Sequence, residues 1–281
     1  MMSGKFYVVA TPIGNLNDIT YRAVDIFKSV DLIASEDTRH TQGLLSHFSI
    51  EKKQFAVHQH NEKASAQKII EYLKDGKHIA LVSDAGTPNI SDPGGLIVKE
   101  VAAAGFDIIP IPGVSAVTTA YSVSGMVHTS FYFYGFLPTT SNQRIKLFES
   151  LQAQSCPMIF YEAPHRIIKT LNDMADFFGK QHEIVVAREL TKTFESIYRG
   201  EISKVKETVE SDSNFQKGEF VILVSPIHHE KKELLTEDQH RILKILLNHM
   251  PTNAAVKLGA EILNINKNHL YGEALKIKKD D

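Results

Sequence analysis

The sequence predicts an α/β protein in which two α/β domains precede a small helical segment. Apolar, strand-like runs alternate with helix-periodic segments through the first 122 residues. The alternation restarts near residue 130, after a small, polar and Gly-containing stretch that is typical of a domain boundary. Beyond residue 231 only helical patterns remain. The expected domains therefore cover residues 1–122, 130–226 and 231–281.

In the first domain, each expected strand leads through a polar or Gly/Pro-rich loop into a helix. The expected strands cover residues 6–10, 32–34, 55–57, 78–82 and 107–111. The expected helices cover residues 21–30, a segment ending near 47, and residues 63–74, 96–104 and 114–122. Such strict alternation indicates a mostly parallel sheet with helices on both of its faces.

The same apolar patterns predict the strands and helices of the second domain and of the tail. Strands are expected at 131–136, 158–161, 183–187 and 220–224, and helices at 143–152, 202–210 and from about 167 to 178. Helices at 237–248, 253–263 and 267–278 form the tail, and the last two have a compact helix-turn-helix spacing. The tail carries only a small excess of basic residues, so a stabilising appendage and a nucleic-acid contact are equally open.

Composition narrows the class of protein. A net charge of -2 does not suggest a general nucleic-acid binder. The single cysteine, Cys156, excludes an internal disulfide framework and fits a reducing compartment. No secretory leader or membrane-length apolar run is apparent, so a cytoplasmic location is expected. The neighbouring histidines His58 and His60, and His228 and His229, lack metal-site spacing, so no metal is expected.

The loop at residues 83–95 follows the expected strand 78–82, at the strand end where open α/β sheets bind ligands. It is about twice as long as a plain turn, and an ordered turn without a ligand is the simpler alternative. Neither a P-loop nor a G-x-G-x-x-G follows a strand. Asp84 and Asp92 would repel phosphate but suit hydroxyl and ammonium groups. S-adenosylmethionine offers both groups, and the helix start at Ser115 could take its carboxylate or adenine edge.

Eight motifs near the expected strand ends and loops belong together: TPIGNL at 11–16, EDTR at 36–39, SDAGTPNISDPG at 83–94, PGVSA at 112–116, GFLP at 135–138, YEAPHR at 161–166, RELTK at 188–192 and KGEF at 217–220. As a set they resemble the ribosomal RNA small-subunit methyltransferase I family of the tetrapyrrole methylases. The resemblance covers about residues 5–225. It implies S-adenosylmethionine-dependent methylation of the ribose 2′-hydroxyl of a cytidine in the decoding region of 16S rRNA. It also implies a homodimer, and a cofactor held between the two domains.

The resemblance also implies a set of cofactor contacts. They are Pro12, Asp84, Ala85, Thr87, Ile90, Ser115, Ala116, Tyr161, Glu162, Ala187 and Phe220. Four basic residues near strand ends suit phosphate contacts at the mouth of a cleft, namely Arg39, Arg166, Arg188 and Lys192.

A ribose hydroxyl is a poor nucleophile while protonated, so a nearby base is expected. The foremost candidates are Glu36, Glu162 and Lys192, with Asp37 and Glu189 as others. Ion pairs between Glu36 and Arg39 or between Arg188 and Glu189 are the structural alternative. Two other functions remain open: methylation of a tetrapyrrole, and a non-catalytic RNA-binding assembly factor.

Overall fold

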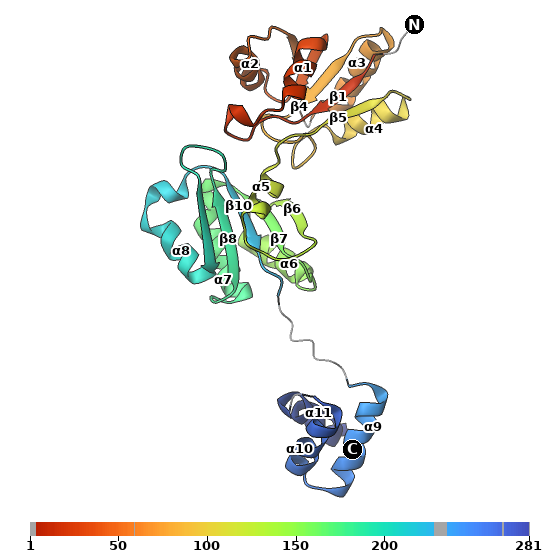
Figure 1. Cartoon of the computed structure of the whole chain (residues 1–281), viewed down its shortest axis with the longest axis vertical. Helices are drawn as coiled ribbons and strands as arrows, with labels where there is room; N and C mark the ends of the chain where they lie inside the picture. Colours follow the sequence, from red (N-terminus) through yellow and green to blue (C-terminus); the bar gives the residue numbers. More distant parts are fainter. Residues whose placement is uncertain (1–3, 59, 228–234, 266, 281) are drawn as a thin grey trace. The chain divides into compact units, whose positions relative to one another are not determined.

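The computed structural model describes residues 4–58, 60–227, 235–265 and 267–280 (Figure 1). The chain divides into two compact units, residues 1–227 and 228–281. The first unit holds two β-sheets and the second is helical. The pair His228 and His229 lies outside the described residues.

The first sheet is parallel throughout, and its strand order is β3-β2-β4-β1-β5. Its strands are β1 (Phe6–Val9), β2 (Leu32–Ser35), β3 (Lys53–Ala56), β4 (Ile79–Val82) and β5 (Ile108–Ile111). Its helices are α1 (Tyr21–Ser29), α2 (Thr38–His47), α3 (Glu62–Lys74), α4 (Gly95–Ala103) and α5 (Ala116–Ser122). Helices α1 and α2 pack on one face and α3 and α4 on the other (Figure 1). All four residues of β4 are therefore buried, and the predicted α/β class is confirmed.

Strands β1 and β4 lie side by side in the centre of this sheet, with Phe6 opposite Ile79. The chain leaves β1 toward β2 and leaves β4 toward β5, on opposite sides. This is a topological switch point, where loops separate and leave a crevice. The two loops are joined by paired backbone hydrogen bonds between Thr11 and Gly86, at 2.8 and 3.0 Å. The first-domain loops are thus held together at the edge where a ligand is expected.

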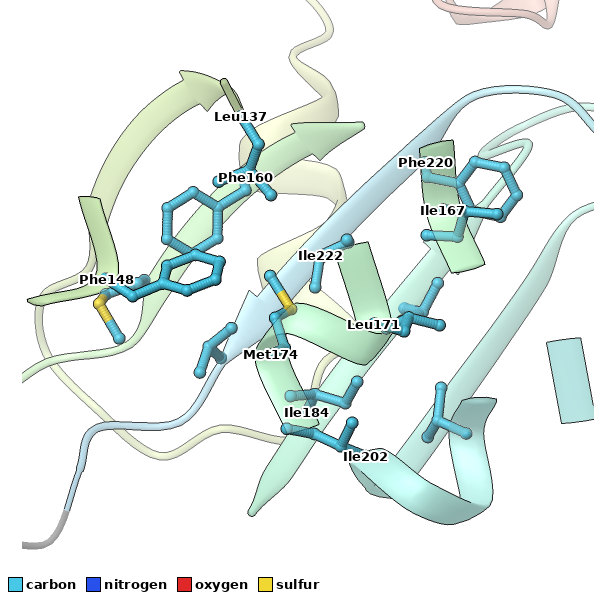
Figure 2. Close-up of a cluster of buried hydrophobic side chains, with 14 of the residues drawn as sticks. Leu137, Phe148, Phe160, Ile167, Leu171, Met174, Ile184, Ile202, Phe220 and Ile222 are labelled. Atoms are coloured by element: carbon cyan, nitrogen blue, oxygen red, sulfur yellow. The ribbon is translucent and has the colours of Figure 1, made fainter. Parts of the chain in front are cut away.

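The second sheet has the order β6-β7-β10-β8-β9, in which only β6 and β7 are parallel. Its strands are β6 (Tyr132–Phe136), β7 (Met158–Glu162), β8 (Glu183–Arg188), β9 (Ser196–Glu201) and β10 (Phe220–Val224). Helices α6 (Ser141–Leu151), α7 (Ile167–Phe178) and α8 (Ile202–Ser211) cover one face. There they bury Phe148, Phe160, Leu171 and Ile222 (Figure 2).

The other face of the second sheet packs against the first sheet's elements. Val185, Val221 and Leu223 lie in one buried cluster with Val117 of α5 and with Ile13 of the loop after β1. Burial of these side chains stabilises the contact, because each large apolar side chain removed from water contributes roughly 1.5–3 kcal/mol. This cluster joins both sheets within the first unit and brings their loops to one place.

The second unit consists of α9 (Glu237–His249), α10 (Thr252–Leu263) and α11 (Lys267–Asp280). Thr236 and Gln239 form a capping box at the start of α9. Asn264, which has a left-handed backbone conformation, ends α10. Leu243, Val256 and Leu270 form the centre of a small core. Within the described residues, no helix has the length and apolar character needed to cross a membrane.

Candidate cofactor and substrate site

A cavity of about 270 Å³ lies where the loops of the two sheets meet. Its first-sheet side consists of Ile13 after β1, the loop at residues 83–94 after β4, and the start of α5. We call the loop at residues 83–94 the central loop. Its second-sheet side consists of Phe136 at the end of β6, the end of β7 with the two residues that follow it, and the start of β10. The lining residues are Ile13, Ala85, Gly86, Thr87, Ile90, Asp92, Ser115, Ala116, Phe136, Tyr161, Glu162, Ala163, Pro164, Glu219, Phe220 and Val221. We call it the first cavity.

The central loop is bent by four residues with positive φ: Gly86, Asn89, Ser91 and Gly94. Two of these carry side chains, so this conformation costs free energy and must be held by its surroundings. The Thr87 hydroxyl donates a 3.0 Å hydrogen bond to the carbonyl of Val114 and so ties this loop to the start of α5. Gly94 is needed here, because an added Cβ would lie 2.5 Å from Asn89 Oδ1. Strain at a strand end is typical of a ligand-binding loop.

Three carboxylates, those of Glu36, Asp84 and Asp92, influence one another at this edge. Burial raises the pKa of Asp92 to about 6, and repulsion by Glu36 and Asp84 adds to it, against a hydrogen bond from Ser83. Burial likewise raises the pKa of Glu36, with repulsion by Asp84 as the second cause. Asp84 Oδ1 accepts a 2.9 Å hydrogen bond from the Asp37 backbone. The edge therefore favours cationic over anionic ligands.

The aromatic side chains that line the first cavity carry no charge at neutral pH. Burial raises the pKa of Tyr161 to about 12, and the charge of Asp92 adds to this rise. The phenol therefore stays protonated at neutral pH and can form hydrogen bonds. Its ring contacts Phe133 and Phe136, with centroids 5.0 and 5.3 Å away.

Most of the predicted cofactor residues lie around this cavity. Eight of them line it: Ala85, Thr87, Ile90, Ser115, Ala116, Tyr161, Glu162 and Phe220. Pro12 and Asp84 line a neighbouring cavity instead. Ala187 lines neither cavity, and its fully buried side chain lies in the cluster between the sheets, so its predicted cofactor contact stays a prediction.

The carboxylate of Glu162 is held by partners inside the protein, which argues against its predicted role as a base. Its side chain is fully buried, and it forms an ion pair with Arg166. Its Oε1 accepts a 2.7 Å hydrogen bond from the Ala163 backbone, and its Oε2 accepts a 2.5 Å bond from the Thr170 hydroxyl. Both oxygens are thus occupied. Arg166, turned toward this carboxylate, is also not the exposed phosphate contact that its sequence position suggested.

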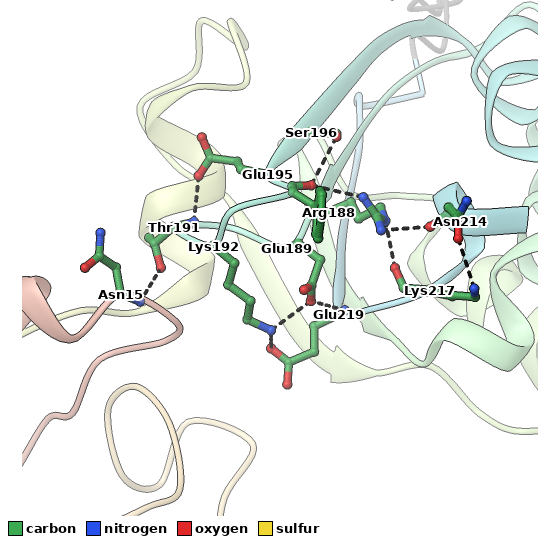
Figure 3. A network of polar contacts seen from close by, with 11 residues as sticks. Asn15, Arg188, Glu189, Thr191, Lys192, Glu195, Ser196, Asn214, Lys217 and Glu219 are labelled. Atoms are coloured by element: carbon green, nitrogen blue, oxygen red, sulfur yellow. Dashed lines mark hydrogen bonds and ion pairs between the residues drawn. The ribbon is translucent and has the colours of Figure 1, made fainter. Parts of the chain in front are cut away.

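Arg188 is likewise buried, and its guanidinium donates to three backbone carbonyls (Figure 3). These bonds go to Lys217 at 2.7 Å, Asn214 at 2.7 Å and Phe194 at 3.0 Å. These bonds inside the protein argue against the predicted contact between Arg188 and RNA phosphate. The residue instead holds together the loops that precede β9 and β10.

Lys192 lies at the centre of a second polar group (Figure 3). Its ammonium donates to Glu189 Oε1 at 2.8 Å and to Glu219 Oε2 at 3.0 Å. Burial lowers the pKa of Lys192, but its bonds to both glutamates outweigh burial and raise that pKa overall. Burial also raises the pKa of Glu189, but the bond from Lys192 outweighs it and lowers the pKa overall. Lys192 therefore stays protonated, which argues against its predicted role as a base.

Lys192 also meets the first sheet's loops. An added Cβ at Gly14 would lie 2.4 Å from Lys192 Cγ, so only glycine allows this approach. The backbone N–H of Asn15 donates to the Thr191 hydroxyl at 3.2 Å. The loop after β8 therefore packs directly against the loop after β1.

A second cavity of about 530 Å³ adjoins the first. It is lined by Thr11, Pro12, Ile13, Gly14, Leu16, Arg39, His40, Gly43, Leu44, Asp84, Ala85, Lys192 and Glu219. Arg39 is 90% exposed and pairs with Asp37 at 2.8 Å, rather than with Glu36. This pairing holds the pKa of Asp37 well below its usual range. Two of the four predicted basic residues, Arg39 and Lys192, thus share one cavity.

Glu219 lines both cavities and was missed as a site residue. In the sequence it lies in the KGEF motif at 217–220, directly before an apolar strand, and no role was predicted for it. Its importance arises because β10 is antiparallel to β7 and β8, so the start of β10 lies beside their ends. In the part of the chain that the structure describes, no three His, Cys, Asp or Glu side chains are grouped so as to hold a metal ion.

The comparisons with known proteins place the chain in a family. Residues 5–206 match the tetrapyrrole (corrin/porphyrin) methylases, and residues 233–278 match the RsmI C-terminal HTH domain. The chain is 48% identical over 265 residues to ribosomal RNA small subunit methyltransferase I of Vibrio cholerae, with 94% of this chain and 92% of that protein covered. The chain belongs to the ribosomal RNA small subunit methyltransferase I family.

Another member of this family, from Neisseria meningitidis, is 44% identical over 278 residues, which cover 99% of this chain and 95% of that protein. Solved structures share the fold at low identity. Diphthine synthase has a TM-score of 0.63 at 15% identity, and the match covers 79% of this chain and 90% of the diphthine synthase chain. The uroporphyrin-III C-methyl transferase of Thermus thermophilus, complexed with S-adenyl homocysteine, has a TM-score of 0.54 at 14% identity. That match covers 79% of this chain and 97% of that one.

Proposed function

We propose that this protein uses S-adenosylmethionine to methylate the ribose 2′-hydroxyl of a cytidine in the decoding region of 16S rRNA, within the small ribosomal subunit. The observation that carries the proposal is the first cavity at the switch point, together with membership of this family. The charged side chains that line this cavity are Asp92, Glu162 and Glu219, all acidic. Such a lining suits a ligand that carries positive charge and no phosphate.

The residues around the first cavity fit this cofactor. Asp92 offers a carboxylate to the ammonium or sulfonium, and Tyr161 offers a hydrogen-bonding phenol. Ile90 and Phe220 supply apolar walls. The cofactor supplies an electrophilic methyl group on a positively charged sulfur. The protein's task is to align the accepting oxygen with that group and to exclude water.

Cofactor affinity is expected to depend on pH through Asp92, whose pKa is about 6 without ligand. The cation prefers the ionised carboxylate, so affinity should fall as pH falls through 6. If only the ionised form binds, the loss between pH 7 and pH 5 reaches about tenfold. Titration calorimetry across this range measures it, and Asp92→Asn should flatten the curve. A wild-type affinity that is constant from pH 5 to 7 would contradict this role.

The exposed cation Arg39 is proposed to contact RNA phosphate at the second cavity. Arg39→Gln should weaken binding to small subunits about tenfold and reduce the salt slope by about one, with cofactor affinity within a few-fold. Arg22→Gln, at an exposed position of α1 that lines neither cavity, is the matched control. Filter binding at several salt concentrations measures both variants. Equal losses for the two would show that Arg39 makes no specific contact.

A homodimer and a cytoplasmic location are also proposed, on the ground of the family resemblance. Light scattering at micromolar concentration should then report about twice the 31.4 kDa chain mass. A stable monomer would exclude the dimer. Ribosomal RNA is favoured over a tetrapyrrole as the substrate, because the relatives that match nearly the whole chain carry the ribosomal name.

Transfer of tritium from labelled cofactor tests the proposed function. The acceptors are small subunits from cells that lack this methylation, and large subunits are the control. We expect label in the small subunits, less in free 16S rRNA and little in short linear RNA, because RNA is recognised largely through its folded shape. Label in the large subunits alone, or in none of the acceptors, would reject the proposal.

A further inference from the structure

The two cavities share a wall. Three residues line both: Ile13, Ala85 and Glu219. Ile13 and Ala85 are apolar, so Glu219 is the only ionisable residue among the described lining residues common to both cavities. A group bound in the second cavity would meet a cofactor bound in the first at this wall.

The lining of the second cavity suits a nucleotide. The exposed guanidinium of Arg39 offers positive charge for a phosphate, whereas the ammonium of Lys192 is already bonded to Glu189 and Glu219. Pro12 and Leu44 offer apolar contact for a base or a sugar, and Asp84 offers an acceptor for an exocyclic amine. Its 530 Å³ also falls in the range of small-molecule sites. The first cavity has no such basic groups among its described lining residues, so the two cavities differ in the ligand they favour.

The carboxylate of Glu219 is held in place yet remains accessible. Its side chain is 75% exposed, and Oε2 accepts the 3.0 Å hydrogen bond from Lys192. Its backbone N–H donates to Glu189 Oε1 at 2.9 Å, and its backbone carbonyl accepts from the Glu189 N–H at 2.9 Å. The residue is thus fixed at three points, with free capacity on its carboxylate to accept another proton donor.

Resting on the proposed function, we infer that the second cavity takes the target nucleotide turned out of its RNA, and that Glu219 is the catalytic base. In this step the 2′-oxygen forms a bond to the methyl carbon while the carbon–sulfur bond breaks. The bonding electron pair stays on sulfur, which becomes a neutral thioether. The hydroxyl proton passes to the Glu219 carboxylate and later to water.

The other candidate bases are less well placed. The ammonium of Lys192 is protonated, and Glu189 accepts bonds from Lys192 and from the Glu219 backbone. Both oxygens of Glu162 are occupied. Asp92 lines the first cavity only, and Glu36 lines neither. Enzymes that modify nucleotides commonly extrude the target into such a pocket.

One variant tests the nucleotide pocket by placing a bulky side chain in the second cavity. Gly43 lies within α2, and an added Cβ would have no heavy atom within 4 Å, so substitution there is tolerated by the fold. Gly43→Phe should slow single-turnover transfer to small subunits at least a hundredfold, with cofactor affinity by calorimetry within a few-fold. Ser46→Phe, at an exposed position of α2 that lines neither cavity, is the matched control and should keep the wild-type rate. Unchanged transfer by Gly43→Phe would overturn the nucleotide pocket.

A second variant removes the proton acceptor. Glu219→Gln retains an oxygen that can accept from Lys192, and its single-turnover rate should fall about 10²–10⁴-fold. Cofactor and subunit affinities should stay within a few-fold. Glu219→Ala should be equally slow, and added formate should accelerate it, since a small carboxylate can enter the space left. Formate should not accelerate Glu219→Gln.

The outcomes separate this inference from the proposed function. A wild-type protein that labels no small subunit defeats the proposed function. A wild-type protein that does label them, with Glu219→Gln within threefold of its rate, defeats the assignment of the base alone. A slow Glu219→Ala variant that formate does not accelerate indicates a merely structural role and also overturns that assignment.

Discussion

Glu162→Ala is expected to lower the free energy of unfolding by about 3–5 kcal/mol, because it leaves Arg166 as an unpaired, nearly buried charge. The bond to Thr170 is lost as well. For a protein of this size, the melting temperature should fall by roughly 10 °C. Chemical denaturation and thermal melting measure the change. The carboxylate lines the first cavity, but its expected contribution is to the fold rather than to proton transfer.

Two variants control for this interpretation. Lys204→Ala removes a surface ion pair with Glu201 and should cost less than about 1 kcal/mol. The double variant Glu162→Ala with Arg166→Met removes both charges and should recover much of the loss, since no buried charge remains unpaired. A double variant that is as unstable as the sum of the two single changes would contradict the assigned pairing.

Arg188→Ala is expected to cost roughly 3 kcal/mol, because three backbone carbonyls lose their charged donor. Arg188→Lys should recover only part of this, since an ammonium cannot reproduce the fork of the guanidinium. The loops at 189–195 and 212–218 should become more sensitive to protease. Stability within about 0.5 kcal/mol of the wild type, together with weakened RNA binding, would restore the original prediction of a phosphate contact.

The sequence predicted most helices and strands, because their apolar spacing follows the periods of helix and strand. Strand β9 was missed. It is a half-exposed edge strand whose residues 196–201, SIYRGE, lack a clear alternation. The predominantly antiparallel pairing of the second sheet was also not predictable, since it depends on contacts between distant segments.

At the site, the sequence located the central loop, because a long loop after a buried strand has one natural place in an α/β fold. The family resemblance supplied half of the residues that line the first cavity. The sequence could not show which charged side chains are buried and paired and which are exposed at the site. Arg188 and Glu162 resemble exposed functional residues in the sequence, yet the antiparallel strands bury both. Glu219 stands in the KGEF motif, but its place at both cavities depends on the pairing of the start of β10 with the end of β7.

The most direct test of the central claim is the identity of the methylated nucleoside. Small subunits that lack the modification are incubated with the protein and labelled S-adenosylmethionine, and their 16S rRNA is digested to nucleosides and separated by chromatography with mass spectrometry. We expect a single labelled product, 2′-O-methylcytidine, at no more than one per subunit. Label on a base, on another nucleoside, or on a tetrapyrrole instead of RNA would contradict it.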